Sequence, residues 1–235
     1  MQTVRRKLLL SLLALPAGCA FQPLPALRTQ AAAAPAVMPA IRPPALGQRW
    51  TYRRYNGYNS ALLATETDEV VALAPQVLIR RRSDAPGAPV LDELQQPWGQ
   101  VQRELAWDHV QTYEEALPLW PAEPRPGARS VHRTYYRVDG FSYRYWISLH
   151  TQVVGWEHLT LGAHDWLALR VERFIRLQHH DVSRLETTRR DTLWRVPALG
   201  RWAAREVSGE YLAPDDPGLF RGLEAHQRWE LQTWS

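Results

Sequence analysis

Cysteine and lysine are almost missing from this sequence. Cys19 is the single cysteine and Lys7 the single lysine among 235 residues, so all other basic side chains are arginines. One thiol cannot form a disulfide within the chain, so the folded part must be stabilised by burial alone. The apolar run LLLSLLAL at 8–15 is too short for a permanent membrane-spanning helix, which needs about 20 residues.

Several signatures of chemistry are also missing. The sequence has no HExxH or CxxC metal pattern, no glycine-rich phosphate loop and no GxSxG nucleophile turn, and it indicates no cofactor. Residues 1–18 hold three basic and no acidic side chains, which leaves 25 basic residues against 24 acidic ones in the rest. This nearly neutral remainder argues against nucleic-acid binding, which requires a concentrated basic face.

The N-terminus has the pattern of an export signal. Three basic residues at 5–7 precede the apolar run at 8–15, and the small residues Ala17 and Gly18 come directly before Cys19. This stretch resembles the lipobox of bacterial lipoproteins, in which the cysteine sulfur receives a diacylglycerol and the signal peptide is cut off before it. The resemblance implies a signal peptide at 1–18 and a lipidated Cys19.

The lipobox resemblance also implies where the protein is held. Pro16 stands where the family usually has leucine, and Ala20 follows the cysteine where aspartate would mean retention in the inner membrane. We therefore expect a periplasm-facing protein on the outer membrane, attached through acyl chains such as palmitate on Cys19. The alternative is an ordinary cleaved signal peptide with an incidental cysteine.

Residues 19–47 read as a linker before a single domain at 48–235. The linker is dominated by alanine and proline and has no amphipathic period, which predicts a disordered or semi-rigid tether. Extended at up to about 3.1 Å per residue, it would hold the domain several tens of ångströms from the lipid.

The domain has the alternation and turn spacing of an antiparallel β protein. The turns Asn56–Gly57, Asp139–Gly140 and 197–200 separate β-favouring segments, and no helix of 10–15 residues lies between them. The region 90–117 fits both a helical and a strand period, so we expect mixed structure there. The predicted strands are 49–55, 65–73, 76–82, 130–138, 141–149, 152–161, 166–178, 185–196, 201–211 and 226–234.

Three stretches carry a family resemblance. LGQRWTYRRYNGYN, LPLWPAEPRPGARS, and GWEHLTLGAHDWLALRVERF with TLWRVPALGRWAAREVSGEY resemble uncharacterised proteobacterial periplasmic lipoproteins related to the lipoprotein-carrier (Lol-type) half-barrel. The resemblance implies a mainly β fold with little helix, built as a strongly bent antiparallel sheet. A half-barrel or open barrel of that kind would offer a groove for an apolar ligand.

Eleven tryptophans, all after residue 49, are many for a domain of this size. Trp194 and Trp202 flank the turn 197–200, and Trp156 and Trp166 lie on the preceding strands. These four are candidates for contact with a ligand or partner, and the alternative is packing in the core or on a sheet face.

His179, His180 and Asp181 are the best metal candidates, and His158 or His164 could join them. Neighbouring side chains on a strand point to opposite faces, so these residues could converge only in a loop, and the alternative is a solvated turn.

Two acidic groups, Glu66–Asp68–Glu69 and Asp215–Asp216, could supply acid pairs for glycoside cleavage, although carboxylates are common near turns. The arginine runs 80–82 and 189–190 are interpreted as solvated strand faces. A catalytic triad depends on geometry that sequence does not show.

These observations predict a membrane-anchored envelope lipoprotein whose β domain binds an apolar ligand or an envelope protein and catalyses nothing. Two alternatives remain open, a periplasmic hydrolase acting on lipid or cell-wall material and a scaffold component of an envelope machine.

Overall fold

The computed structural model describes residues 24–105, 107, 109–213 and 221–235, and in this part of the chain it is built almost wholly of strands. Cys19 and the predicted signal peptide lie outside the described residues. The elements are β1 (Arg28–Ala32), β2 (Arg49–Asn56), β3 (Leu62–Ala72), β4 (Val77–Ser83), β5 (Leu91–Gln95), β6 (Gln100–Glu104), β7 (Gln111–Pro118), β8 (Arg129–Val138), β9 (Tyr145–Leu161), β10 (His164–Leu177), β11 (Glu186–Val196), the 3₁₀ turn η1 (Pro197–Leu199), β12 (Arg201–Leu212), β13 (Arg221–Leu223) and β14 (Gln227–Trp234).

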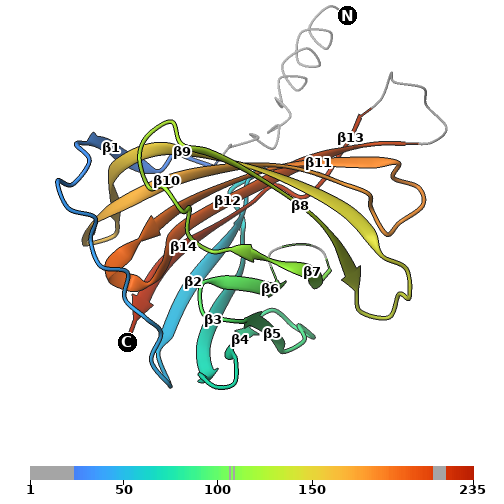
Figure 1. Ribbon diagram of the computed structural model, residues 1–235, viewed down its shortest axis with the longest axis horizontal. Helices are drawn as coiled ribbons and strands as arrows, with labels where there is room; N and C mark the ends of the chain where they lie inside the picture. Colours follow the sequence, from blue (N-terminus) through green and yellow to red (C-terminus); the bar gives the residue numbers. More distant parts are fainter. Residues whose placement is uncertain (1–23, 106, 108, 214–220) are drawn as a thin grey trace, which may run out of the picture.

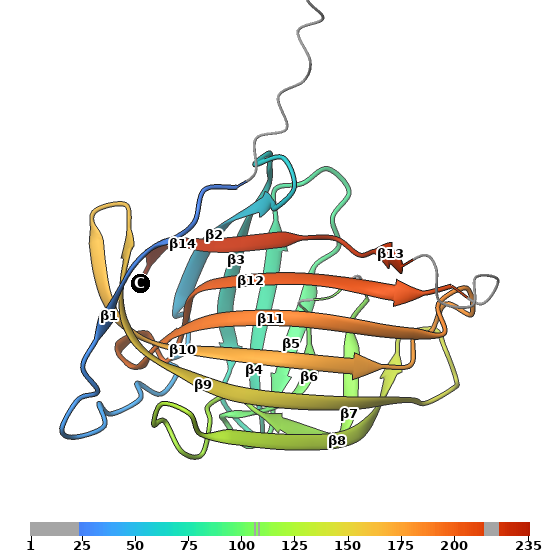
Figure 2. The same ribbon diagram turned by 90° about the horizontal axis from the view of Figure 1, so that it is seen from above.

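Twelve of these strands form a closed antiparallel barrel. From β2 to β12 each strand pairs with the next along the chain, and β14 then pairs with both β12 and β2. The predicted half-barrel or open barrel is therefore corrected to a full ring, because the first and last strands of the barrel meet from Asn56–Gln227 to Trp50–Trp234. In Figure 1 and Figure 2, the strands β8–β12 and β14 run across the strands β2–β7.

The strand predictions hold where the alternation is strong and differ elsewhere. The predicted strands 141–149 and 152–161 form one long strand, β9, which begins at Tyr145, because His150 and Thr151 pair with Phe174 and Arg173 of β10 in unbroken register. The region 90–117 contains the three strands β5, β6 and β7. Two of them have only five residues, too short to show a clear period.

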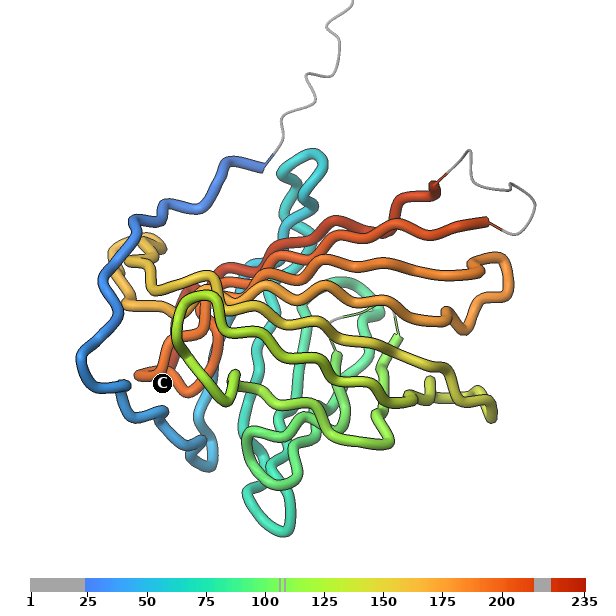
Figure 3. Tube along the Cα trace, turned by 45° about the horizontal axis from the view of Figure 1, so that its top comes forward, coloured from blue at the N-terminus to red at the C-terminus, as the bar shows by residue number. Residues whose placement is uncertain are grey.

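Residues 24–47 lie against the barrel, in contrast to the predicted disordered linker. β1 pairs with the second half of β9, from Arg28–Thr160 to Ala32–Trp156. The segment continues along the barrel (Figure 3), and the Arg42 amide donates to the Pro197 carbonyl at 2.9 Å. Leu27 packs on the hydrophobic core of the barrel. This burial of apolar surface stabilises a stretch that is too rich in alanine and proline to form a core of its own.

Two main hydrophobic clusters occupy the barrel. One gathers around Trp50, Tyr52 and Trp202, and the other around Tyr113, Tyr136 and the inner face of β9. Charged side chains contact both. The Arg201 guanidinium carbon lies 5.3 Å from the centre of the Trp50 ring, and Arg173 lines the same small cavity as Leu117 and Trp202.

Candidate functional site

The lumen of the barrel contains arginines and carboxylates in direct contact. Alternation along β3 places Glu66 and Asp68 on the inner face, and alternation along β11 does the same for Arg189, Asp191 and Arg195. All five are at most 4 % exposed. A buried charge is stable only when it is paired and hydrogen-bonded. The partners of these groups therefore determine how stable the charged interior is.

The first cluster joins β3, β4, β5 and β12. Arg81 donates from Nε and Nη2 to the two oxygens of Asp68 at 2.7 and 2.9 Å. Arg201 donates to Asp68 Oδ2 at 2.6 Å and to both oxygens of Glu93 at 3.1 and 3.0 Å. Glu66 pairs with Arg81 at 3.3 Å. Fork-to-fork pairing of this kind is the strongest form of side-chain hydrogen bonding available to arginine.

The second cluster joins β6, β10, β11 and β12. Arg173 and Arg205 both bind Asp191, with Nε distances of 2.7 and 2.9 Å. The same two guanidiniums reach Glu104 Oε1 at 3.1 and 2.8 Å. The Tyr113 hydroxyl donates to the other oxygen of Glu104 at 2.8 Å. The two arginines and two carboxylates thus hold four strands of the barrel together from within.

The ionisation of these carboxylates follows from their partners. Burial alone would raise the pKa of Asp68 and that of Glu104, but the two arginines that bind each carboxylate outweigh it and lower the pKa of both. Both groups are therefore ionised at neutral pH, and neither can serve as a protonated general acid. The predicted acid pair Glu66–Asp68 belongs to the structural network, while Asp215–Asp216 lies outside the described residues.

One end of the barrel opens into a chamber of about 440 Å³. It lies where β13 flanks the ring (Figure 2), with Leu223 of β13 in its wall. Its apolar lining includes Leu105, Trp107, Val207 and Trp229. The mouth of a barrel is a common place for a ligand, and this volume lies within the range of small-molecule sites.

Charged groups line the other part of this mouth chamber. Arg184 binds Glu224 at 2.9 Å, and Arg54 lies 3.0 Å from Glu66. The side chains of Arg54 and Arg184 are about a quarter exposed, so both reach solvent at the rim. The chamber therefore places two tryptophans beside solvent-facing guanidiniums, a combination suited to a ligand with an apolar body and a polar end.

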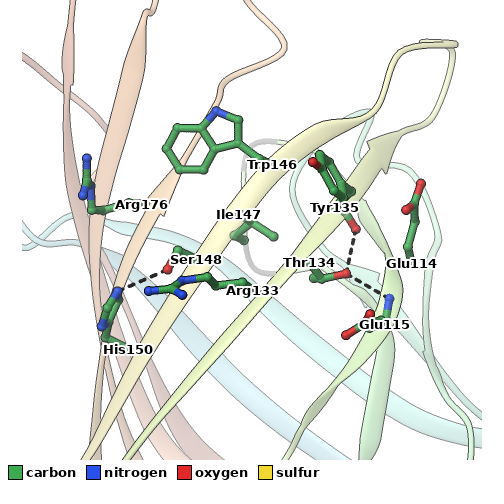
Figure 4. A pocket seen from close by; sticks show the side chains of 10 residues that line it. All are labelled: Glu114, Glu115, Arg133, Thr134, Tyr135, Trp146, Ile147, Ser148, His150 and Arg176. Atoms are coloured by element: carbon green, nitrogen blue, oxygen red, sulfur yellow. Dashed lines mark hydrogen bonds between the residues drawn. The ribbon is translucent and has the colours of Figure 1, made fainter.

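A groove of about 540 Å³ opens on the outer wall over β7–β10. The β7–β8 ladder ends after the pair Tyr113–Tyr136, and the Glu115 amide beyond it donates to the Thr134 hydroxyl at 3.0 Å. Figure 4 shows Trp146 beside this groove and Ser148 next to His150. The hydroxyl and the imidazole Nε2 of that pair are 3.1 Å apart.

This outer groove bears on the hydrolase alternative. A serine and a histidine within hydrogen-bond reach are two of the three members of a nucleophilic triad. Among the described residues, His150 contacts Ser148 and Phe174, and no hydrogen bond or ion pair joins it to a carboxylate that would orient its ring. The pair therefore offers no more than a hydrogen bond on the surface of a strand.

The tryptophans singled out by sequence are mainly buried. Trp156, Trp194 and Trp202 are 4, 6 and 3 % exposed. The Trp202 ring stacks inside the barrel on Tyr52, with ring centres 4.1 Å apart. Trp166 is partly buried against the core. Trp202 lies opposite Arg195 and Trp194 lies opposite Ala204 in the β11–β12 register, so the two tryptophans that flank the turn are not a directly opposed pair.

The histidine candidates are spread over separate parts of the fold. His179 is buried and accepts a hydrogen bond from the Asp181 amide at 3.0 Å, and its ring centre is 4.2 Å from that of His180. His158 instead pairs with Asp165 at 3.0 Å across the β9–β10 hairpin. In the described part of the chain, no group of three or more His, Cys, Asp or Glu side chains is arranged to hold a metal ion.

The arginine runs divide between the two faces of their strands. Arg81 and Arg189 point inward and are buried, whereas Arg80, Arg82 and Arg190 face outward. The interpretation as solvated faces is therefore wrong for one arginine in each run. Sequence reasoning also missed Glu93, Glu104, Asp191, Arg195, Arg201 and Arg205.

None of the helices among the described residues has the length and apolar content needed to span a membrane.

No protein-family profile and no curated protein matches the sequence. Two solved structures match this chain to different degrees. The "putative lipoprotein" of Parabacteroides distasonis has a TM-score of 0.50 and 11 % identity, over 84 % of this chain and 99 % of that chain. The hypothetical lipoprotein YmcC of Escherichia coli has a TM-score of 0.39 and 13 % identity, over 74 % of this chain and 90 % of its own.

The described residues place the chain in the class of closed antiparallel β-barrels with a charged interior. The Parabacteroides protein has a similar fold, and the similarity extends over nearly the whole length of that protein. The second similarity is too weak to establish a common fold.

Proposed function

We propose that this chain is a lipid-anchored protein of the bacterial envelope whose barrel binds a small amphipathic ligand and catalyses no reaction. The anchoring part is supported by the lipobox-like stretch that ends at Cys19 and by the fold shared with a protein described as a lipoprotein. The binding part is carried by one observation, the mouth chamber with its tryptophans beside rim arginines.

The chamber suggests how such a ligand would lie. Its apolar body would contact Trp107 and Leu105, and its polar end would face Arg54 and Arg184 at the rim. Trp107 is already held in place, because the guanidinium carbon of Arg189 lies 4.6 Å from its ring centre. A preformed surface of this kind binds without a large ordering penalty.

The binding test compares two tryptophans that line different hollows. Native mass spectrometry of the purified protein with dodecanoate, and with the uncharged dodecyl maltoside, reports the bound amphiphile. We expect Trp107→Ala to weaken dodecanoate binding at least about tenfold, since a fully buried aromatic contact contributes on the order of 1.4 kcal/mol or more. Trp146→Ala, in the outer groove, is the matched control and should bind as the unaltered protein does. Equal losses in both variants would contradict a ligand site at the mouth.

The anchoring test is independent of the binding test. Cells expressing the protein are labelled with radioactive palmitate and compared with cells expressing Cys19→Ser. We expect label and envelope association only with the thiol present. Unlabelled protein with residues 1–18 still attached would rule out the anchor and leave the binding proposal to its own experiment.

A further inference from the structure

Arg195 has no hydrogen-bond acceptor although it is buried inside the barrel. It faces inward from β11 and is 2 % exposed. Its Nε and Nη1 atoms are buried, and neither has a hydrogen-bond partner within the described ranges. The guanidinium carbon lies 5.7 Å from the centre of the Trp120 ring. A buried charge left in this way is among the most unfavourable arrangements in a protein interior.

The charges around Arg195 do not balance. Its cluster contains three guanidiniums, those of Arg173, Arg195 and Arg205, against the two carboxylates of Glu104 and Asp191. Both carboxylates are already bound by Arg173 and Arg205. The first cluster, which contains Glu66, Asp68 and Glu93, has no free carboxylate to offer Arg195.

That neighbouring cluster is balanced within itself. Glu66, Asp68 and Glu93 are matched by Arg54, Arg81 and Arg201. Glu93 also lines the cavity next to Arg195, but both of its oxygens accept from Arg201. The local excess of one positive charge therefore belongs to Arg195.

A cavity of about 20 Å³ lies beside this guanidinium. Its walls include Arg173, Arg195 and Arg205 together with apolar atoms of Leu117 and Leu193. A volume of roughly 10–15 Å³ is enough for the centre of a water-sized sphere. The space therefore suits a small guest.

We propose that Arg195, with Arg173 and Arg205, forms a buried site for one compact monovalent anion of the halide class. A halide in the cavity would neutralise the excess charge of Arg195, whereas a water molecule would not. Burial, followed by repulsion from Arg173, lowers the pKa of Arg195 to about 9, against the opposing attraction of Asp191. The guanidinium is thus charged at neutral pH but held in unfavourable surroundings, which an anion would relieve.

This site is separate from the proposed ligand site at the mouth. The two cavities share no lining residue, and Arg195 lies six residues beyond Arg189 along β11. The proposal goes beyond the proposed function, and an amphiphile at the mouth would neither require nor exclude a halide here.

The first experiment measures thermal unfolding of the purified protein in sodium chloride and in sodium gluconate at equal ionic strength. Gluconate is too large for the cavity. We expect a Tm about 2–4 °C higher in chloride, because an anion that binds only the folded state stabilises it. Arg195→Gln should abolish this difference. Arg190→Gln, an exposed arginine on the same strand, should retain it.

A second experiment does not depend on the folding of a variant. Crystals of the protein grown in sodium bromide are examined for anomalous scattering from bromine. We expect one peak in the cavity lined by Arg173, Arg195 and Arg205. Density at that place without anomalous signal would identify water and overturn the proposal. Equal Tm values in chloride and gluconate, or a chloride effect that survives Arg195→Gln, would overturn it as well.

Discussion

Single residues inside the barrel carry charges that the surface of a soluble protein would normally hold. Asp191 accepts from Arg173 and Arg205 and is fully buried. Replacing an interior ion pair with apolar groups can be harmless, but removing one partner leaves an uncompensated charge. The contribution of such a residue is therefore best tested by removing its charge while keeping its shape.

Asp191→Asn should destabilise the protein by about 3–5 kcal/mol, because two buried guanidiniums lose their shared counter-charge. Urea unfolding followed by tryptophan fluorescence gives the free energy. The control is Glu186→Gln, which breaks the largely exposed pair with Arg176 and should cost less than about 1 kcal/mol. Similar losses in the two variants would show that the interior network contributes little.

The sequence could not show which charges face inward. Alternation identifies the inner face of a strand through its apolar residues, and β4 reads Val77, Ile79 and then Arg81 along that face. Arg80, Arg81 and Arg82 follow one another, so both faces of β4 carry arginine at this point. Alternation along the strand places Arg81 on the face opposite to Arg80 and Arg82, but it does not show which of the two faces is buried.

At the scale of elements, β1 is one of the strands that the sequence did not predict. Its five residues, RTQAA, have no apolar alternation, and four of them are exposed. It is a strand because the free edge of β9 beyond the β8 pairing offers backbone partners. A partner distant in the chain therefore decided its structure. The strands with strong local alternation, such as β10 and β11, were predicted within two residues of their bounds.

A disulfide can test the position of β1. Gln30 lies opposite His158 in the β1–β9 register, and both side chains are exposed. In a Cys19→Ser background, the pair Gln30→Cys and His158→Cys should form a disulfide on mild oxidation, because directly opposed residues meet its Cα spacing. Mass spectrometry after digestion without reductant detects the linked peptides.

The matching control is Gln30→Cys with His150→Cys. His150 is exposed on the same strand but pairs with Val131 of β8, eight residues from the proposed partner. This second pair should remain reduced. A free thiol in the first pair, or equal linkage in both, would contradict the docking of β1.

For the whole molecule, the closure of the ring depends on one pairing between distant segments. β2 and β14 meet although the whole barrel lies between them in sequence. The sequence predicted the hairpins, since each is local and marked by a turn, but a meander alone does not determine whether its ends meet. The mouth chamber and the two charge clusters depend on that closure, so they could not be predicted either.

The charged interior predicts a dependence of stability on acid. The folded-state pKa of Asp68 and that of Glu104 lie below the ordinary values of about 3.9 and 4.3. Below those ordinary values the unfolded chain binds more protons than the folded one, so the free energy of unfolding rises with pH in that window. Stability should be level above about pH 5 and fall as the pH drops below about 4.

Urea unfolding at pH 7, 5, 4 and 3 measures this dependence. We expect a loss of more than about 1.4 kcal/mol by pH 3, the equivalent of one pKa unit. Glu104→Gln should be less stable at pH 7 and lose less on acidification, whereas Glu186→Gln should follow the unaltered protein. A flat profile between pH 5 and 3 would mean that these carboxylates gain nothing from folding.

Because residues 24–47 lie against the barrel, the length of free chain between the proposed anchor at Cys19 and the barrel is shorter than the predicted linker. A free spacer of about 26 residues in polyproline form could extend by roughly 80 Å. With that stretch bound to the wall, five peptide steps separate Cys19 from Leu24, and chain geometry limits their span to about 18 Å. A barrel fixed so near its acyl chains would exchange molecules with its own leaflet and could not travel across to the opposite membrane.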